Sequence, residues 1–400
     1  MQKPFLIDRG SHLERQSACL QPYAVPHDEA QGLGRAHQEI PDKDEGLRFA
    51  IDRSRVTFSE FFRRLGDKVQ VMPVQRPDYV PGSRLSHTYE VAALSRDIAS
   101  ELGVNADLAE TIGLMHDLGH CGLGHEGERP VHAWAKEQSD GAIGFDHNAQ
   151  AHRIVTLLTD HMSPETMGTY GLNLNTESVE GLLVKDMPYN DRDKPERSPS
   201  LEAQIVEQAD DIAYLARDTE DALQLGIIKK QHLVTHTFFH EVIARADGWY
   251  ANIRSRIIAA LKYLLKQATQ QKIKNMHIES IDQVYVASEQ IVRLPEEAAV
   301  CMEAFRQTLY NTMYQGVHKR DFSDASEDVM RALAENYYAR PNTTIEFYAF
   351  KAQANEDHCP RVRATCDYIA RMTYQQVLQT AKAIGVQERE ITALRSIEWK

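Results

Sequence analysis

The sequence is poor in several features that would each indicate a particular class of protein. Its 400 residues include only five cysteines, an odd number without a CxxC pair, so neither a disulfide framework nor a zinc knuckle is expected. No stretch approaches the ~18 consecutive apolar residues of a membrane-spanning helix, and the N-terminus lacks the apolar core of a signal peptide. We therefore expect a cytoplasmic protein with no membrane association.

Positive charge is also scarce. The 45 basic side chains are outnumbered by 58 acidic ones, which gives a formal net charge of −13. Sequence-independent binding to nucleic acid or to an anionic lipid surface requires a positive field, so such binding is not expected. A polyanionic substrate in a locally basic cleft remains compatible with this composition.

Glycine and proline are infrequent too, at 21 and 15 residues. Alternation typical of strands is rare, whereas apolar residues recur at three- and four-residue steps along most of the chain. This pattern predicts an all-α protein, with helices over 87–102, 108–116, 201–225, 251–270, 296–316, 325–338 and 362–384. Three segments lack the pattern and are expected to be irregular: 1–50, 186–200 and 339–360.

Histidine, by contrast, is abundant and concentrated. Of 17 histidines, eight fall within a span of 75 residues: His87, His116, His120, His125, His132, His147, His152 and His161. An even distribution would place about three there. The sequence therefore points to a site built from imidazoles.

Within this span, the adjacent pair His116-Asp117 lies at an expected helix end and is followed by a glycine-rich segment. His87 lies on the buried stripe of an earlier helix, and Asp210 lies beside an apolar run, where an unpaired carboxylate would be costly. Two imidazoles and two carboxylates suit Mn²⁺, Fe²⁺, Zn²⁺ or Ni²⁺ and leave positions open for water and substrate. Each signal alone is weak, since a single histidine on an apolar stripe is more often a core residue and HD pairs occur by chance.

The ordered set H…HD…D resembles the HD-domain metal-dependent phosphohydrolases, and most of the chain is similar to their deoxyguanosine triphosphate triphosphohydrolase (dGTPase) family. The similar segments are 22–24, 52–55, 62–65, 83–87, 116–128, 145–150, 171–175, 200–214 and 366–373. The resemblance implies an HD-domain helical core with additional C-terminal helices. It also implies hydrolysis of deoxynucleoside triphosphates to deoxynucleoside and tripolyphosphate.

By this resemblance, His87, His116, Asp117 and Asp210 hold a divalent metal ion, for which magnesium is a further candidate. Asp210 is preferred over its neighbour Asp211 because it stands four residues before the matching Tyr214. His125 and Glu128 would form an acid/base pair, and His147 would stabilise charge or transfer protons. Helix capping or loop packing is the structural alternative for His125 and His147.

The triphosphate needs counter-charge. Residues 53–84 contain seven basic and three acidic side chains, a local net charge of +4. Arg84 resembles a phosphate-contacting arginine of the family, and Lys185 is a second candidate. A solvated basic face is the alternative for Arg53 and Lys68.

Asp210, Tyr214 and Asp218 are spaced at i, i+4 and i+8, so the three side chains are expected to line one face of a helix. The resemblance implies that Tyr214 packs on the deoxyribose and that Asp218 bonds its 3′-hydroxyl. Alternatively, Tyr214 is a core residue and Asp218 pairs with Arg217.

The chain departs from the family pattern in two places. Cys121-Gly122-Leu123 replaces a usual Pro-Pro-Phe, which puts the shape of the pocket and the base preference in question. Arg371 and Tyr374 stand where glycine and aspartate are usual, and Arg371 is expected to alter packing or an interface.

We expect three regions: an N-terminal arm (1–50) that orders on a neighbouring subunit, a catalytic core (51–225), and a C-terminal helical region (226–400) that completes the pocket and an oligomer interface. A homo-oligomer and an activating nucleotide are further expectations. Two other functions compete with dNTP hydrolysis. One is an HD phosphohydrolase for another nucleotide, and the other is a regulatory protein that binds nucleotides or single-stranded nucleic acid and has vestigial catalysis.

Overall fold

The computed structural model describes residues 9–28, 32–36, 47–70, 82–159, 171–184, 196–245, 252–314, 317–354 and 359–395. Within these ranges strand pairing is limited to two isolated bridges, Arg35 with Asn175 and Val69 with Ser83. The fold is all-α, as the sequence predicts. Among the described helices, none is both long and apolar enough to cross a membrane.

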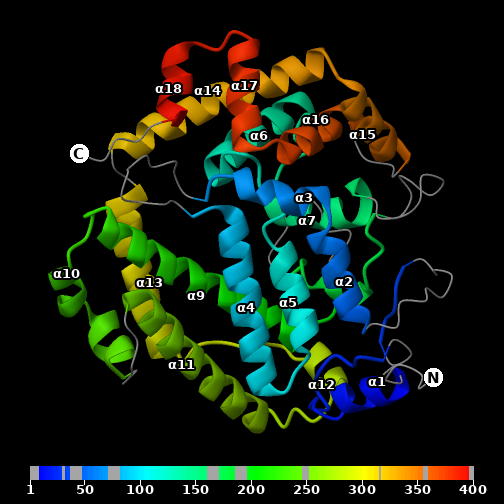
Figure 1. Ribbon diagram of the computed structural model, residues 1–400, viewed down its shortest axis with the longest axis vertical. Coiled ribbons are helices and arrows are strands. Elements are labelled where there is room, and N and C mark those ends of the chain that lie inside the picture. Colours follow the sequence, from blue (N-terminus) through cyan, green and yellow to red (C-terminus); the bar gives the residue numbers. More distant parts are fainter. Residues whose placement is uncertain are drawn as a thin grey trace, which may run out of the picture.

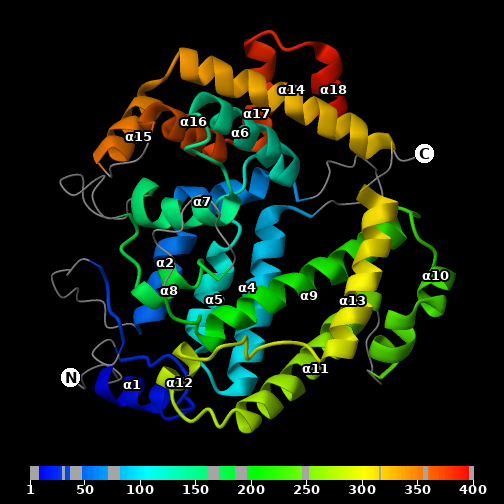
Figure 2. The same ribbon diagram turned by 180° about the vertical axis from the view of Figure 1, so that it is seen from behind.

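The first half of the chain forms the helices α1 to α9 (Figures 1 and 2). They are α1 (Arg9–Ser17), α2 (Arg48–Thr57), α3 (Glu60–Arg64), α4 (Arg84–Leu102), α5 (Ala106–Met115), α6 (Gly124–Gln138), α7 (His147–Arg153), α8 (Thr176–Glu180) and α9 (Leu201–Gln224). The remainder consists of α10 (Lys230–Thr235), α11 (Ile253–Asn275), α12 (Ile281–Tyr285), α13 (Glu296–Leu309), α14 (Val317–Ala339), α15 (Thr343–Ala354), α16 (Pro360–Arg371), α17 (Tyr374–Ala383) and α18 (Glu388–Arg395).

Local capping determines where the helices of the site begin. Ser83, Asn105 and Ser200 each accept a hydrogen bond from a backbone N–H in the first turn of α4, α5 and α9. Such caps satisfy donors that the helix itself leaves unpaired. Gly103 ends α4 with φ +72°, a left-handed conformation that favours glycine. The sequence thus positions each helix that carries a candidate ligand.

Two hydrophobic cores meet at the histidine-rich segment. The first is built mainly from α2, α4, α5, α9, α11 and α13. The second joins α6 to α14, α16, α17 and α18, which lie together at the top of Figure 1. After α5 the chain passes from one core to the other, since Leu118 is buried in the first and Cys121 and Leu123 in the second. Residues 116–123 are therefore fixed from both sides.

Most of the predicted helices are present, with two differences. The segment 362–384 forms two helices, because Thr373 and Gln376 make a capping box that starts α17. The expectation of irregular structure over 339–360 is wrong, because α15 lies within it. Its prolines mark helix starts: Asn342, directly after Pro341, caps α15, and Pro360 occupies the first turn of α16.

The proposed N-terminal arm falls partly within the described residues. Residues 9–17 form α1, and Ala24 and Val25 are buried in the first core. The loop expected at 186–200 lies outside the described residues up to 195. The division into three regions stays a prediction.

Candidate metal centre and active site

One pocket of about 720 Å³ gathers nearly all the candidate residues. Its walls come from α4, α5, α6, α7, α9, α13 and α14, so the C-terminal region contributes to it. The predicted site residues that line it are Arg84, His87, His116, Asp117, His125, His147, Asp210, Tyr214 and Asp218. Glu128 lies directly behind His125 and His147, and Lys185 lies outside the described residues.

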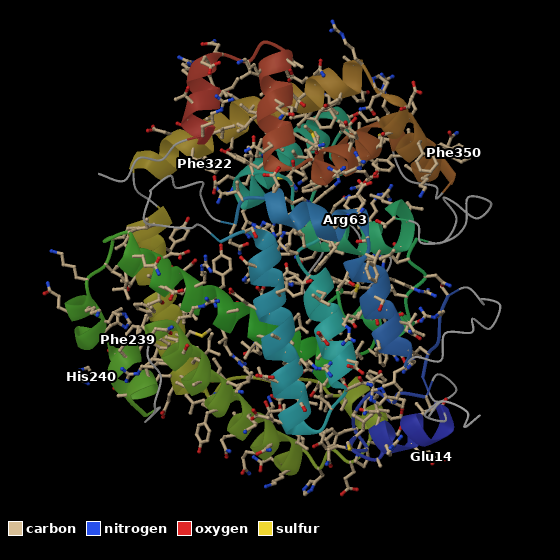
Figure 3. The ribbon with its side chains drawn as sticks, in the orientation of Figure 1. Glu14, Arg63, Phe239, His240, Phe322 and Phe350 are labelled. Carbon is tan, nitrogen blue, oxygen red and sulfur yellow. The ribbon has the colours of Figure 1, made fainter. Side chains whose placement is uncertain are left out.

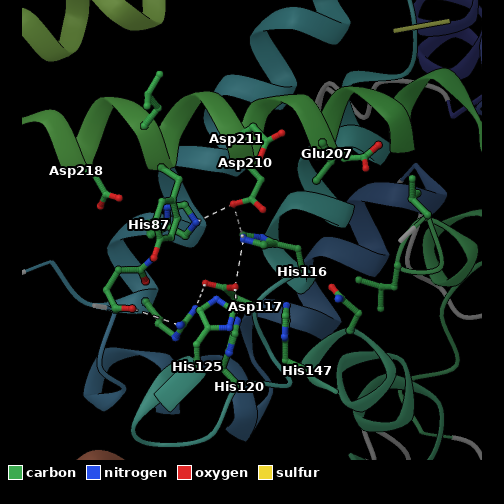
Figure 4. Close-up of a pocket in the computed structure, with 18 of the residues that line it drawn as sticks. His87, His116, Asp117, His120, His125, His147, Glu207, Asp210, Asp211 and Asp218 are labelled. Carbon is green, nitrogen blue, oxygen red and sulfur yellow. Dashed lines mark hydrogen bonds and ion pairs between the residues drawn. The ribbon is translucent and has the colours of Figure 1, made fainter. Parts of the chain in front are cut away.

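The four predicted metal ligands lie together, although they come from three separate parts of the chain (Figure 4). His87 Nε2 lies 3.0 Å from Asp210 Oδ1. His116 Nε2 lies 3.4 Å from Asp117 Oδ1 and 3.6 Å from Asp210 Oδ1. Asp211 instead pairs with Arg306 at 3.1 Å. The helical turn of α9 therefore directs Asp210, and not its neighbour, toward the histidines.

The hydrogen bonding of His116 shows that this group suits a cation. Its Nδ1 lies 2.7 Å from the carbonyl oxygen of Gly113, so Nδ1 carries the proton of the neutral ring. Nε2 then presents a lone pair, is buried, and has no hydrogen-bond partner. Because both oxygens that it faces belong to carboxylates, a bound cation resolves the repulsion between these acceptors. The residues present fit a divalent metal with two imidazole and two carboxylate ligands.

Arg84 and His120 hold Asp117 in place. Arg84 is almost fully buried and donates to Asp117 Oδ2 at 3.0 Å, while His120 Nε2 lies 3.2 Å from Oδ1. Burial disfavours the charged carboxylate, but His116, Arg84 and His120 outweigh this effect and hold the pKa of Asp117 well below its usual range. Arg84 also donates to the carbonyl oxygens of Val69 and Gln70. In this structure its contacts are those of a residue that orients Asp117.

A second cluster surrounds Glu128. The backbone N–H of His147 donates to Glu128 Oε1 at 3.0 Å, and His147 Nδ1 lies 3.2 and 3.1 Å from the two carboxylate oxygens. His125 Nδ1 lies 3.5 Å from Oε2, and the ring of His120 stacks on that of His147 with centroids 3.9 Å apart. The sequence paired Glu128 with His125 alone, whereas the structure makes it a carboxylate shared with His147.

The surroundings of His125 and His147 shift the pKa values of the two side chains in opposite directions. The side chain of His125 is 50% exposed at the pocket mouth, yet the desolvation that remains lowers its pKa and outweighs the hydrogen bond with Glu128. His147 is more enclosed, and desolvation is the largest single effect on it, but the hydrogen bond with Glu128 and the negative charges of Glu128, Asp146 and Asp117 together outweigh desolvation and raise its pKa. Burial opposes the charge of Glu128, and hydrogen bonds from His125 and His147 reverse that effect and hold its pKa far below the usual range. Opposite shifts of neighbouring groups are typical of acid/base sites.

The α9 face that was predicted to meet the sugar lines the pocket. Tyr214 makes an edge-to-face contact with His87 at 5.6 Å between ring centroids, and Asp218 lies in the same wall as Asp210 (Figure 4). Arg217 pairs with Asp221 at 3.3 Å and with Glu90 at 3.7 Å. The i, i+4, i+8 spacing therefore does direct these side chains into one cavity.

The prediction that the basic stretch 53–84 meets the phosphates is wrong for most of its members. Arg53 pairs with Glu110, Arg55 donates to the carbonyl oxygens of Leu172 and Asn173, and Arg64 binds Glu60 and Gln376. Arg63, labelled in Figure 3, donates to the carbonyl oxygen of Phe58. Basic residues that are close together in the sequence therefore do not bring their positive charges together in the pocket, because their side chains contact different parts of the protein.

The position of Lys68 contradicts both predictions made for it from the sequence, which were a phosphate contact and a solvated basic face. Lys68 is 2% exposed, and its ammonium donates to the carbonyl oxygens of His120 and Ala370. Burial lowers its pKa to about 7. Lys68 is therefore neither a solvated cation nor a phosphate contact, and it ties the segment before α6 to the end of α16.

Sequence reasoning missed two arginines that do line the pocket. Arg306 of α13 pairs with Asp211, and Arg129 of α6 lies 3.5 Å from Glu126. Arg129 follows Glu128 directly and could have been found in the motif, whereas no sequence signal connects Arg306 with α9. These arginines replace the stretch 53–84 as candidate sources of counter-charge.

The unusual residues 121–123 face away from the pocket. Cys121 and Leu123 are buried in the second core. A Cβ atom at Gly122 would lie 2.9 Å from the carbonyl carbon and oxygen of Thr373, so the backbone of this segment packs directly on the start of α17. The residues that replace Pro-Pro-Phe therefore pack against the C-terminal helices.

The second departure from the family pattern, Arg371 and Tyr374, also concerns packing between helices. Arg371 donates to Glu60 Oε1 at 2.6 Å, and the hydroxyl of Tyr374 donates to the carbonyl oxygen of Leu394 at 2.8 Å. Both contacts join the ends of α16 and α17 to other helices of the same chain. Arg371 therefore takes part in packing within the chain.

The backbone of α7 packs directly against Gly119, which follows the His116-Asp117 pair by two residues. A Cβ atom there would lie 1.9 Å from the carbonyl oxygen of His147 and 2.6 Å from the backbone nitrogen of Ala151. We expect Gly119→Ala to lower the free energy of unfolding by about 1–3 kcal/mol and to reduce turnover by displacing His147. Urea denaturation and kcat would be measured. Gly66→Ala is the matched control, since its Cβ would meet only Leu85 at 3.6 Å, and equal stability of the two variants would contradict this interpretation.

Comparisons with known proteins agree with this architecture. Residues 84–215 match the HD domain, and residues 292–383 match the phosphohydrolase-associated domain. Three relatives are each described as a deoxyguanosinetriphosphate triphosphohydrolase-like protein. The one from Geobacter metallireducens is 32% identical over 89% of this chain and 92% of its own length. Those from Paracoccus denitrificans and Azoarcus sp. are 30% and 34% identical over 91% and 88% of this chain, covering 99% and 93% of their own lengths.

The two domain matches cover most of the pocket walls, because the first includes all four candidate metal ligands and the second includes Arg306. The chain is thus a hydrolase of the metal-dependent HD phosphohydrolase class. With three relatives matched over most of their length, the chain belongs to the deoxyguanosinetriphosphate triphosphohydrolase-like family of HD-domain proteins.

Proposed function

We propose that this protein hydrolyses deoxynucleoside triphosphates, either dGTP or several dNTPs, to deoxynucleoside and tripolyphosphate. The observation that carries the proposal is the junction of two groups in one pocket. His87, His116, Asp117 and Asp210 form a site suited to a divalent metal, and the His125–Glu128–His147 cluster adjoins it through His120. The names of the relatives support the choice of a triphosphate substrate.

The metal ion would be held by His87, His116, Asp117 and Asp210, and manganese, magnesium, iron, zinc and nickel are all compatible with this ligand set. When bound, such an ion supplies Lewis-acid polarisation of a phosphoryl oxygen and lowers the pKa of a coordinated water. Arg84 and His120 keep Asp117 ionised and oriented for this role.

Side chains of the protein would accept and donate the protons of the reaction. In the reaction, a water oxygen attacks the α-phosphorus, the bond from phosphorus to the 5′-oxygen breaks, and that oxygen takes up a proton. His125 has a lowered pKa, is neutral at pH 7, and suits the acceptor of the water proton. His147 has a raised pKa and suits the donor to the 5′-oxygen. Glu128 orients both rings.

Substrate binding would use the remaining walls. Tyr214 and Asp218 line the pocket, which supports their proposed contact with the deoxyribose. Phosphate oxygens could replace Glu126 and Asp211 as the partners of Arg129 and Arg306. Lys185 and Arg84 stay predictions as phosphate contacts. A homo-oligomer, an activating nucleotide or single-stranded nucleic acid, and a cytoplasmic location also stay predictions.

Product analysis tests the proposal. We expect purified protein with Mn²⁺ or Mg²⁺ to release tripolyphosphate from at least one dNTP, supplied singly or in mixtures, as measured by ³¹P NMR and ion-exchange chromatography. Release of orthophosphate or pyrophosphate would instead indicate an HD phosphohydrolase for another nucleotide. A complete lack of turnover with every mixture would favour the regulatory binding protein.

A further inference from the structure

The carboxylate of Glu128 is surrounded by imidazole nitrogens. Its Oε2 atom lies 3.1 Å from His147 Nδ1, 3.5 Å from His125 Nδ1 and 3.7 Å from His120 Nδ1. These four residues each offer a ligand atom within 4.8 Å of the others, and none of them belongs to the proposed first metal site. Figure 4 shows the three rings gathered below that site.

His120 has a lone pair that points at this carboxylate. Its Nε2 lies 3.2 Å from Asp117 Oδ1, and because the carboxylate accepts, Nε2 carries the N–H of the neutral ring. Nδ1 is therefore an acceptor, and it is buried without a hydrogen-bond partner. An acceptor nitrogen that faces a carboxylate oxygen in the protein interior is unfavourable unless a cation lies between them.

His147 plays a different part in the cluster. Its backbone N–H and its Nδ1 both reach Glu128 Oε1, at 3.0 and 3.2 Å. These contacts fix the carboxylate. His147 Nδ1 also lies 3.1 Å from Oε2, and that oxygen keeps a lone pair for a further partner. Hydrogen bonds of this kind commonly orient a ligating carboxylate from outside the coordination shell. His147 therefore serves as the orienting residue of the group.

The distances match a small four-coordinate cation. For ligand bonds of 2.0–2.1 Å in a tetrahedron, ligand atoms lie about 3.3 Å apart. The separations of Glu128 Oε2 from the Nδ1 atoms of His125 and His120 are 3.5 and 3.7 Å, which small side-chain rotations would close. The rings of His120 and His125 are nearly perpendicular at 87°, so their lone pairs can converge on one point. Three protein ligands and a water are typical of an open zinc site.

We propose that His120, His125 and Glu128 form a second cation site, which takes Zn²⁺ or a similar nitrogen-preferring ion and inhibits the enzyme when filled. Inhibition follows because the ion occupies the imidazole that must accept a proton. This consequence rests on the proposed function, whereas the binding of the ion does not. The two sites differ in chemistry, since the first has an equal number of imidazole and carboxylate ligands.

Zinc stoichiometry of the full-length protein tests the site directly. After removal of bound metal, equilibrium dialysis against Zn²⁺ and elemental analysis should give two ions per wild-type chain. His125→Ala and Glu128→Gln should each retain one ion and bind the second at least about 100-fold more weakly. His87→Ala should lose the other ion and keep this one. His240→Ala is the matched control, because His240 is exposed at the periphery (Figure 3) and should leave both ions in place.

A single zinc ion in the wild type would overturn the proposal and would mean that a proton alone fills the cluster. The proposal of a second cation site would also fail if both His125→Ala and Glu128→Gln retained two ions. A separate assay addresses inhibition in the Mn²⁺-loaded enzyme, with manganese content measured in the same samples. The Zn²⁺ concentration that halves tripolyphosphate release should equal the Kd of the second ion. If no tripolyphosphate is formed, the proposed function fails while the stoichiometry still decides the site.

Discussion

Replacing Asp210 by asparagine is expected to remove the divalent metal and to lower dNTP turnover by at least about 100-fold, whereas the same change at Asp211 should leave the metal in place. The two residues are neighbours on α9 but have different partners. Asp210 faces His87 and His116, and Asp211 faces Arg306. An asparagine at Asp210 keeps the shape of the side chain and removes the charge that a divalent ion requires.

Metal content by elemental analysis and kcat are the measurements for this pair. Asp211→Asn removes the nearer of the two carboxylate partners of Arg306, Asp211 and Glu303, so a change in KM is the expected effect there, with the metal retained. Equal loss of metal in both variants would contradict the assignment of Asp210. Circular dichroism and thermal unfolding serve as checks that both proteins fold.

The second large effect is expected for His125→Ala, which should lower kcat by roughly 10²–10⁴-fold while the metal at the first site is retained. His125 contacts Glu128 and lines the pocket, but it is not within the group formed by His87, His116 and Asp117. Its half-exposed position means that truncation leaves little buried space. Loss of activity would therefore report chemistry and not unfolding.

The pH profile of the wild type provides an independent check on His125. Because its pKa lies below the ordinary value, the neutral ring is the form present at pH 7, and a base must be neutral to act. We expect kcat to fall only as the pH drops below about 6.5, and this acid limb to disappear in His125→Ala. Turnover in His125→Ala equal to that of the wild type would refute the role.

Local sequence was sufficient for the helical framework and for the order of the candidate ligands. Helix periodicity and caps act over a few residues, so segments such as 87–102 and 201–225 were predicted with small errors at their ends. The i, i+4, i+8 spacing on α9 also needed no tertiary information, because helical geometry alone places these side chains on one face. The prediction of irregular structure at 339–360 was wrong, because a proline can mark the start of a helix as well as its end.

Contacts between distant segments could not be predicted in the same way. Glu128 was assigned to His125 because the two are close in sequence, yet His147 from another helix approaches it more closely. The arginine of α13 that reaches the pocket carries no sequence signal, because its partner on α9 is 95 residues away.

The sequence by itself therefore determined an all-α chain of this family and the set of residues from which a metal site can be built. Tertiary structure alone decided which charges reach the pocket. Of the basic stretch 53–84, the arginines at 53, 55, 63 and 64 and Lys68 bind other parts of the protein, and Arg84 lies behind Asp117. The physical reason is that the direction of a long side chain depends on the packing of its helix against others, which neither net charge nor spacing specifies.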